Sequence, residues 1–140
     1  MTAPRPQVGD TVPELVLEMT ATRIVAGAIA TRDFMPVHHD KAYAESQGAP
    51  DIFMNIISTN AYCSRYLTDW AGPTARLTRL AIRLGVPAFP GSTLTFSGSV
   101  VAVEARPDGR IVEVGIELRA STDLGDHAVG TASLVLPVAP

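Results

Sequence analysis

One long apolar segment limits the folds open to this sequence more than any other feature. Between residues 52 and 70, apolar side chains recur at the spacing of a helix face, and the stripe that they form is wide. Its members are Ile52, Phe53, Ile56, Ile57, Cys63, Tyr66, Leu67 and Trp70. A helix that is apolar over so much of its circumference is usually buried. We therefore predict one long buried helix, capped at its start by Asp51 and stopped by Gly72-Pro73.

The sequence on either side of this segment predicts shorter elements. Alternating apolar and polar residues favour strands over 77–84, 92–104, 111–121 and 128–138, and turn signals at 107–109 and 124–126 favour an antiparallel meander. Before the long helix we expect a short strand at 15–17 and helical turns at 22–30. A loop at 31–40 and a small helix at 41–47, with Asp40 as its N-cap, complete the prediction.

These elements predict an α+β domain in which an antiparallel sheet wraps around one long central helix. An open ferredoxin-type sandwich would need a second long helix, and a small β-barrel would not need so long a buried one. The chain has 140 residues, of which 46% are hydrophobic, and this is enough apolar material for one core. We expect residues 1–140 to form a single domain.

Charge and cysteine content exclude several classes of function. The formal net charge is −3 and the 11 Lys and Arg residues form no run, so nucleic acid is not an expected partner. No stretch approaches the roughly 20 apolar residues of a membrane span, and the first residues lack the pattern of a secretion signal. The single cysteine, Cys63, cannot form an intramolecular disulfide, which is typical of a reducing compartment. We expect a cytoplasmic protein that does not associate with membranes.

The residues able to do chemistry gather in the predicted loop at 31–40. Asp33 and His38 both lie there, and Pro36 between them fixes one backbone angle, so a bent loop can aim both side chains into one cleft. Taken alone, the pattern is better explained by an Asp33 that caps a helix and a His38 that sits in the core. The run His38-His39-Asp40 is not expected to bind a metal, since three consecutive residues do not easily converge on one ion. His127, in a turn signal, is expected to be solvated.

The same loop resembles a known motif. The string Asp33-Phe34-Met35-Pro36-Val37-His38 resembles the hydratase motif of the MaoC-like (R)-specific enoyl-CoA hydratases, in which Asp-x-Asn-Pro-(Leu/Ile/Val)-His precedes the helix of a hot-dog fold. Further blocks resemble the small MaoC-like subunit of the heteromeric enoyl-CoA hydratases of actinobacterial steroid side-chain degradation. These blocks are residues 32–34, 37–40, 51–53, 68–73, 83–87 and 124–127.

The resemblance implies a single hot-dog fold and a catalytic pair. Asp33 and His38 would hold a water that adds to C3 of a 2-enoyl-CoA, while the pair supplies the proton to C2; which of the two takes the first proton stays open. An imidazole and a carboxylate are suited to this acid/base work near neutral pH. Met35 stands where the family has Asn, so the amide that normally braces the loop is missing.

The resemblance also implies substrate-binding residues at the start of the long helix. They are Phe53, Met54 and Asn55, with the Met54 backbone N–H as the donor to the oxyanion that develops on the thioester. Phe53-Met54 stands where the family usually has His-Gly, so no side chain assists there.

The expected function is therefore the hydration of a bulky, steroid-derived 2-enoyl-CoA, by a subunit that needs no cofactor and no metal. The acyl-CoA substrate and a second MaoC-like subunit, in a heterodimer or heterotetramer, are the expected partners, because one hot-dog unit leaves a sheet edge and an apolar face open. Two alternatives stay open. One is an acyl-CoA thioesterase that recruits Asp51 with Asn55, and the other is a non-catalytic subunit that only completes a heteromer.

Overall fold

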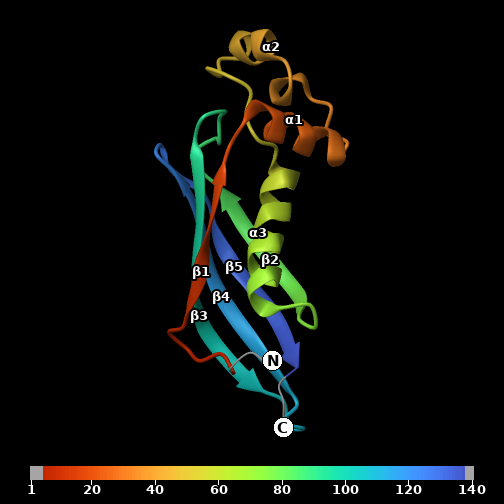
Figure 1. Cartoon of the computed structure of the whole chain (residues 1–140), viewed down its shortest axis with the longest axis vertical. Coiled ribbons are helices and arrows are strands. Elements are labelled where there is room, and N and C mark those ends of the chain that lie inside the picture. Colours follow the sequence, from red (N-terminus) through yellow and green to blue (C-terminus); the bar gives the residue numbers. More distant parts are fainter. Residues whose placement is uncertain (1–4, 138–140) are drawn as a thin grey trace.

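The computed structural model describes residues 5–137 and contains one long helix packed on one sheet (Figure 1). The elements in chain order are β1 (Thr11–Glu18), α1 (Ala21–Ala30), the 3-10 turn η1 (Pro36–His38), α2 (Lys41–Ser46), α3 (Ile56–Ala71), β2 (Arg76–Leu84), β3 (Thr93–Ala105), β4 (Ile111–Thr122) and β5 (Gly125–Pro137). In Figure 1, α3 lies along the sheet, and α1 and α2 lie beyond one of its ends. The predicted α+β hot-dog arrangement is confirmed. Residue 138 of the last predicted strand and the ends of the predicted domain fall outside the described residues.

The five strands form one antiparallel sheet in the order β1-β3-β4-β5-β2. Strands β3, β4 and β5 form the expected meander, but β2 does not pair with β3. It pairs instead with β5 at the opposite edge, with Ile82 facing Gly130. The connection after β2 is therefore a crossover and not a hairpin turn, and Pro87 and Pro90 lie in it. The prediction of an uninterrupted meander is wrong for this strand.

Helix α3 starts later than its sequence predicts. Its N-cap is Asn55, whose side chain accepts a hydrogen bond from the Ser58 N–H at 3.1 Å, and not Asp51. Residues 52–54 are not helical, although Ile52 and Ile56 stand one helical turn apart in the sequence. Asp51 instead bonds to its neighbour, the Ile52 N–H, at 2.7 Å. Asp40 is the N-cap of α2 as predicted, and its side chain accepts from the Tyr43 N–H.

Only one face of α3 is buried, so the helix is less buried than its wide apolar stripe predicts. The buried residues of α3 are Ser58, Thr59, Cys63, Tyr66 and Leu67. Ile56 and Ile57, in the first turn, are 51% and 49% exposed. The first turn thus presents apolar side chains to the outside at the end of the molecule where α1 and α2 lie.

Helices α1 and α3 approach closely where Gly27 meets Ser58. A Cβ placed at Gly27 would come within 2.5 Å of the Ser58 Oγ. This hydroxyl is buried and has no hydrogen-bond partner among the described residues. A buried hydroxyl without a partner destabilises the folded state, so the close contact is not optimised for stability.

We expect Ser58→Ala to raise the free energy of unfolding by about 1 kcal/mol, because it removes the unpaired hydroxyl. Gly27→Ala should lower it by about 1–3 kcal/mol in the natural chain, since its methyl group collides with Ser58. In the Ser58→Ala background the same change should be neutral or stabilising, because alanine favours a helix by about 1 kcal/mol over glycine. Urea denaturation of the four proteins measures these effects, and equal losses from Gly27→Ala in both backgrounds would contradict the explanation.

His127 is buried, with 3% of its surface exposed, so its prediction as a solvated turn residue is wrong. Its Nδ1–H donates to the Val86 carbonyl at 2.7 Å, and its Nε2 accepts from the Thr59 hydroxyl at 2.9 Å. The imidazole therefore joins β5 to the loop after β2 and to the first turn of α3. Burial lowers the pKa of His127 below its ordinary value of 6.5, although the hydrogen bond to Val86 acts in the opposite direction.

This lowered pKa predicts a loss of stability in acid. As the pH falls below about 6.5, the unfolded chain takes up a proton on His127 while the folded chain resists it, so the free energy of unfolding decreases. Above that pH the residue is neutral in both states and its contribution is constant. We expect His127→Gln to flatten the decline between pH 6.5 and 5 in denaturant titrations. Identical pH dependences for His127→Gln and the natural chain would refute this assignment.

Candidate active site

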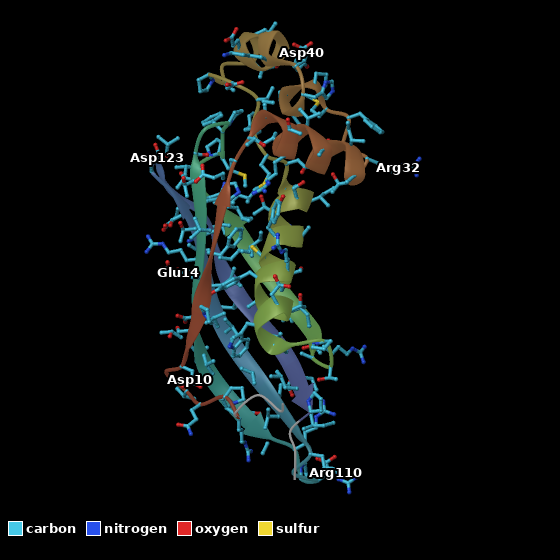
Figure 2. All side chains as sticks on the ribbon, in the orientation of Figure 1. Asp10, Glu14, Arg32, Asp40, Arg110 and Asp123 are labelled. Carbon is cyan, nitrogen blue, oxygen red and sulfur yellow. The ribbon has the colours of Figure 1, made fainter. Side chains whose placement is uncertain are left out.

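The end of helix α1 determines where Asp33 lies. The Asp33 N–H donates to the Ala28 carbonyl at 2.9 Å and the Arg32 N–H donates to the Ile29 carbonyl at 3.0 Å, which together form a Schellman motif. Arg32 takes the left-handed position of this motif, with φ 56°, where glycine is preferred. A side chain at this backbone conformation costs about 1–2 kcal/mol, so the surrounding bonds hold the turn against strain. Figure 2 labels Arg32 and Asp40, which lie near the two ends of the loop that joins α1 to α2 and carries Asp33 and His38.

The rest of the loop folds back so that His38 faces Asp33. The Asp33 Oδ1 accepts from the Met35 N–H at 3.3 Å, and Pro36 begins the single turn η1 that carries His38. The Phe53 N–H donates to the Val37 carbonyl at 3.4 Å and ties this turn to the segment before α3. The loop that was predicted to aim both side chains together does so.

The Asp33 carboxylate and the His38 imidazole lie next to each other, with Oδ2 and Nε2 3.5 Å apart. The His38 Nδ1 lies 2.7 Å from the Phe53 carbonyl oxygen, which can only accept, so Nδ1 carries the proton. In the neutral ring Nε2 is then a hydrogen-bond acceptor turned toward a second acceptor, the carboxylate. The pair is suited to bind a group that donates to both atoms, and His38 is only 8% exposed.

Asn55 braces Asp33 from the start of α3. Its Nδ2 donates to the Asp33 Oδ2 at 2.9 Å and to the Thr31 Oγ1 at 2.8 Å. This hydrogen bond is the main cause that lowers the pKa of Asp33 below its usual value, helped by the Met35 N–H and by His38 and opposed by burial. The amide missing at position 35 therefore has a counterpart on the helix. Predicted as a substrate-binding residue, Asn55 instead bonds to protein groups through both ends of its amide.

Met54 does not have the free N–H that was predicted to bind the oxyanion. Its N–H donates to the Ala88 carbonyl at 3.1 Å, in the connection between β2 and β3. Because α3 begins at Ile56, the backbone N–H groups at its start that have no acceptor among the described residues are those of Asn55, Ile56 and Ile57. The donors at the helix N-terminus are thus displaced from the predicted position.

Phe53 supports His38. Its ring meets the imidazole edge to face, with centroids 5.1 Å apart, and it meets Phe89 in the same way at 6.2 Å. Its carbonyl sets the tautomer of His38, as described above. Phe53 therefore lies at the predicted site, and its observed ring contacts are to His38 and Phe89.

The other polar residues near the loop have local roles. Asp51 lies 3.8 Å from the Lys41 Nζ in an ion pair. His39 donates from Nε2 to the Phe34 carbonyl at 3.2 Å, and Asp40 caps α2. Within residues 5–137, no group of three His, Cys, Asp or Glu side chains is arranged to hold a metal ion.

Two hollows in the surface lie away from the pair. One of about 230 Å³ lies between β1 and the end of α3 and is lined by Pro13, Glu14, Leu15, Tyr66, Asp69 and Trp70. The other, of about 430 Å³, lies over β3, β4 and β5 and includes Ser97, Glu117 and Arg119. Neither contains Asp33 or His38. In the part of the chain described, no helix is long and apolar enough to cross a membrane.

Comparison with known proteins identifies the family of this chain. The family described as MaoC like domain matches residues 6–122. The chain belongs to the MaoC-like family. Among curated proteins of this family, the 3-oxo-4,17-pregnadiene-20-carboxyl-CoA hydratase beta subunit of Mycobacterium tuberculosis is 46% identical over 127 residues, which cover 91% of this chain and 94% of the relative.

Solved structures of MaoC-like proteins share the fold. A chain of the ChsH1-ChsH2 complex from Mycobacterium tuberculosis matches with a TM-score of 0.86 and 42% identity, over 93% of this chain and 98% of that one. The (R)-hydratase from A. caviae involved in PHA biosynthesis matches with a TM-score of 0.81 and 24% identity, over 96% of this chain and all of that one (100%). The second likeness supports the fold alone.

Proposed function

We propose that this chain is the subunit of a heteromeric hydratase that adds water to a bulky, steroid-derived 2-enoyl-CoA. The observation that carries the proposal is the facing pair of acceptors, the Asp33 Oδ2 and the His38 Nε2, 3.5 Å apart. The name of the relative that is 46% identical supports the substrate, a 3-oxo-4,17-pregnadiene-20-carboxyl-CoA.

The pair is arranged to orient a water molecule. A water that donates one hydrogen to Asp33 and the other to His38 turns its lone pairs outward, toward C3 of the enoyl thioester. As the oxygen bonds to C3, the pair takes one proton from the water, and it delivers a proton to C2 so that H and OH add across the double bond. Positioned acid/base groups of this type accelerate proton transfer by about 10²–10⁴-fold.

The thioester oxygen gains negative charge during the addition and needs hydrogen-bond donors. We assign this role to the Ile56 and Ile57 N–H groups at the N-terminus of α3, in place of the Met54 N–H. Backbone donors at a helix N-terminus stabilise such charge because the helix dipole points its positive end there.

Exposed apolar side chains flank the pair and support a bulky acyl group bound between two subunits. Phe34 and Met35 follow Asp33, and Ile56 and Ile57 follow Asn55; all four are at least 47% exposed. A second MaoC-like subunit would cover part of this surface, and the similarity to a chain of the ChsH1-ChsH2 complex supports a heteromer. The proposal includes a cytoplasmic location, which the single free cysteine supports. It requires no cofactor.

The test is an absorbance assay at the enoyl thioester band, made with the chain alone and with its MaoC-like partner. The substrates are crotonyl-CoA and a steroid enoyl-CoA. Loss of the band with the CoA still esterified, only for the steroid substrate and only with the partner, is the expected result. Release of free thiol would mean a thioesterase, and no change in any combination would mean a non-catalytic subunit.

A further inference from the structure

We propose that Asn55 is a positioning residue that orients the Asp33 carboxylate for the reaction and does not bind the substrate. This inference rests on the proposed hydratase function, and it names a residue that acts through Asp33. Its basis is the set of hydrogen bonds around the amide, which is 2% exposed.

The network determines which way the amide points. The Thr31 hydroxyl donates its proton to the Gly27 carbonyl at 2.8 Å, so it can only accept from Asn55. The Asn55 Oδ1 faces a donor, the Ser58 N–H. The NH₂ group must therefore face Thr31 and Asp33, and both of its hydrogens are engaged. A buried amide with both ends occupied has no donor left for a substrate.

The hydrogen bond from Asn55 reaches the carboxylate oxygen of Asp33 that faces His38. Asn55 donates to the Asp33 Oδ2, the same oxygen that lies beside the His38 Nε2, while the Met35 N–H donates to Oδ1. A donor at each oxygen fixes the rotation of the carboxylate, so that the free lone pair of Oδ2 points at a fixed place near His38. A second acidic group at position 55 would remove this donor and repel the carboxylate.

Charge supports the same role. The hydrogen bond from Asn55 is the largest cause of the lowered pKa of Asp33. His38 is the titratable neighbour that also lowers this pKa, through its charge. The other partners in this hydrogen-bond network are uncharged: the Met35 N–H, which donates to Asp33, and the Thr31 hydroxyl, which accepts from Asn55. The folded chain thus keeps Asp33 ionised at neutral pH, as an acceptor for water.

The sharpest variant is Asn55→Asp, made in the complex with the partner subunit. Aspartate is as good an N-cap as asparagine and keeps the bond to the Ser58 N–H, so α3 should form normally. It replaces the donor to Asp33 by a second carboxylate. We expect kcat at pH 7 to fall at least about 10-fold and the acid limb of the pH–rate profile to move up by about one unit or more, with a smaller change in KM.

Asn60→Asp is the matched control. It makes the same chemical change in the second turn of α3, where the Asn60 side chain donates to the Ile56 carbonyl and does not contact Asp33. Its pH–rate profile should equal that of the natural protein. Asn55→Ser, which keeps a capping oxygen but is too short to reach Asp33, should lower kcat without adding a charge and carries the test if Asn55→Asp does not fold.

A reading that does not depend on turnover separates this inference from the proposed function. The pKa of the Asp33 carboxyl group can be measured from the NMR chemical shift of its carboxyl carbon in protein with labelled aspartate. The Asp33→Asn variant assigns the signal. A higher Asp33 pKa in Asn55→Asp would support the inference even if no enoyl-CoA were hydrated. An unchanged pKa with unchanged kcat would overturn it, and a rise in KM alone would show that Asn55 binds the substrate.

Discussion

Asp33→Asn and His38→Ala should each lower kcat by at least about 10²-fold while the protein stays folded. The asparagine fits the space of the aspartate but has one NH₂ group, and both carboxylate oxygens of Asp33 face donors, the Met35 N–H and the Asn55 amide. Either orientation of the new amide therefore places donor against donor. His38→Ala removes the Nε2 acceptor. Steady-state kinetics with the steroid enoyl-CoA and the partner subunit measure both losses.

The neighbouring histidine offers a matched control. His39 is exposed, and its side chain hydrogen-bonds to the Phe34 carbonyl and not to Asp33 or His38, so His39→Ala should keep nearly normal turnover. Near-normal rates in Asp33→Asn and His38→Ala would exclude the acid/base pair. A large loss in His39→Ala would mean that the loop as a whole is fragile, and that the first two results do not identify the catalytic groups.

Phe96→Ala should lower the free energy of unfolding by about 3–5 kcal/mol, a large share of the stability of a small domain. Phe96 is completely buried on β3 and packs against two rings of α3, with its centroid 5.9 Å from that of Tyr66 and 6.4 Å from that of Tyr62. Its removal leaves a cavity between the helix and the sheet. Chemical denaturation measures the loss.

Phe34→Ala is the matched control for this substitution, since Phe34 is 64% exposed and buries little surface. Its effect on stability should be within about 0.5 kcal/mol of zero. If both substitutions destabilised the protein equally, the helix–sheet contact around Phe96 would not be the centre of the core.

The sequence predicts the strands and α2 of this fold well, because hydrophobic periodicity and capping residues are local signals. The start of α3 is missed, since Asp51 and Asn55 are both good caps and Ile52 continues the apolar stripe by chance. Long-range bonds, from the Met54 N–H to Ala88 and from the Phe53 N–H to Val37, keep residues 52–54 out of the helix. The edge position of β2 is missed for a similar reason, because pairing with β5 depends on a crossover that no local signal marks.

The candidate site divides in the same way. Asp33 and His38 are recognisable because both belong to one short motif, and a bent loop can bring them together. Asn55 was placed at the site, but its role as a brace depends on the distance between α1 and α3, which the sequence does not state. His127 was predicted to be solvated because its turn signal is local, whereas its burial comes from α3 and the loop after β2.

The Schellman motif at the end of α1 also decides which changes of chain length this protein can accept. Each residue added to a helix turns the next one by about 100° around the axis. One residue inserted within α1 would therefore swing Asp33 away from His38, even if every original side chain were kept. Beyond His38, the chain runs through α2, whose six residues lie at the periphery of the molecule. Insertions there leave the positions of Asp33 and His38 unchanged. Natural variation in length should accordingly accumulate after His38, and grafted loops should be introduced there.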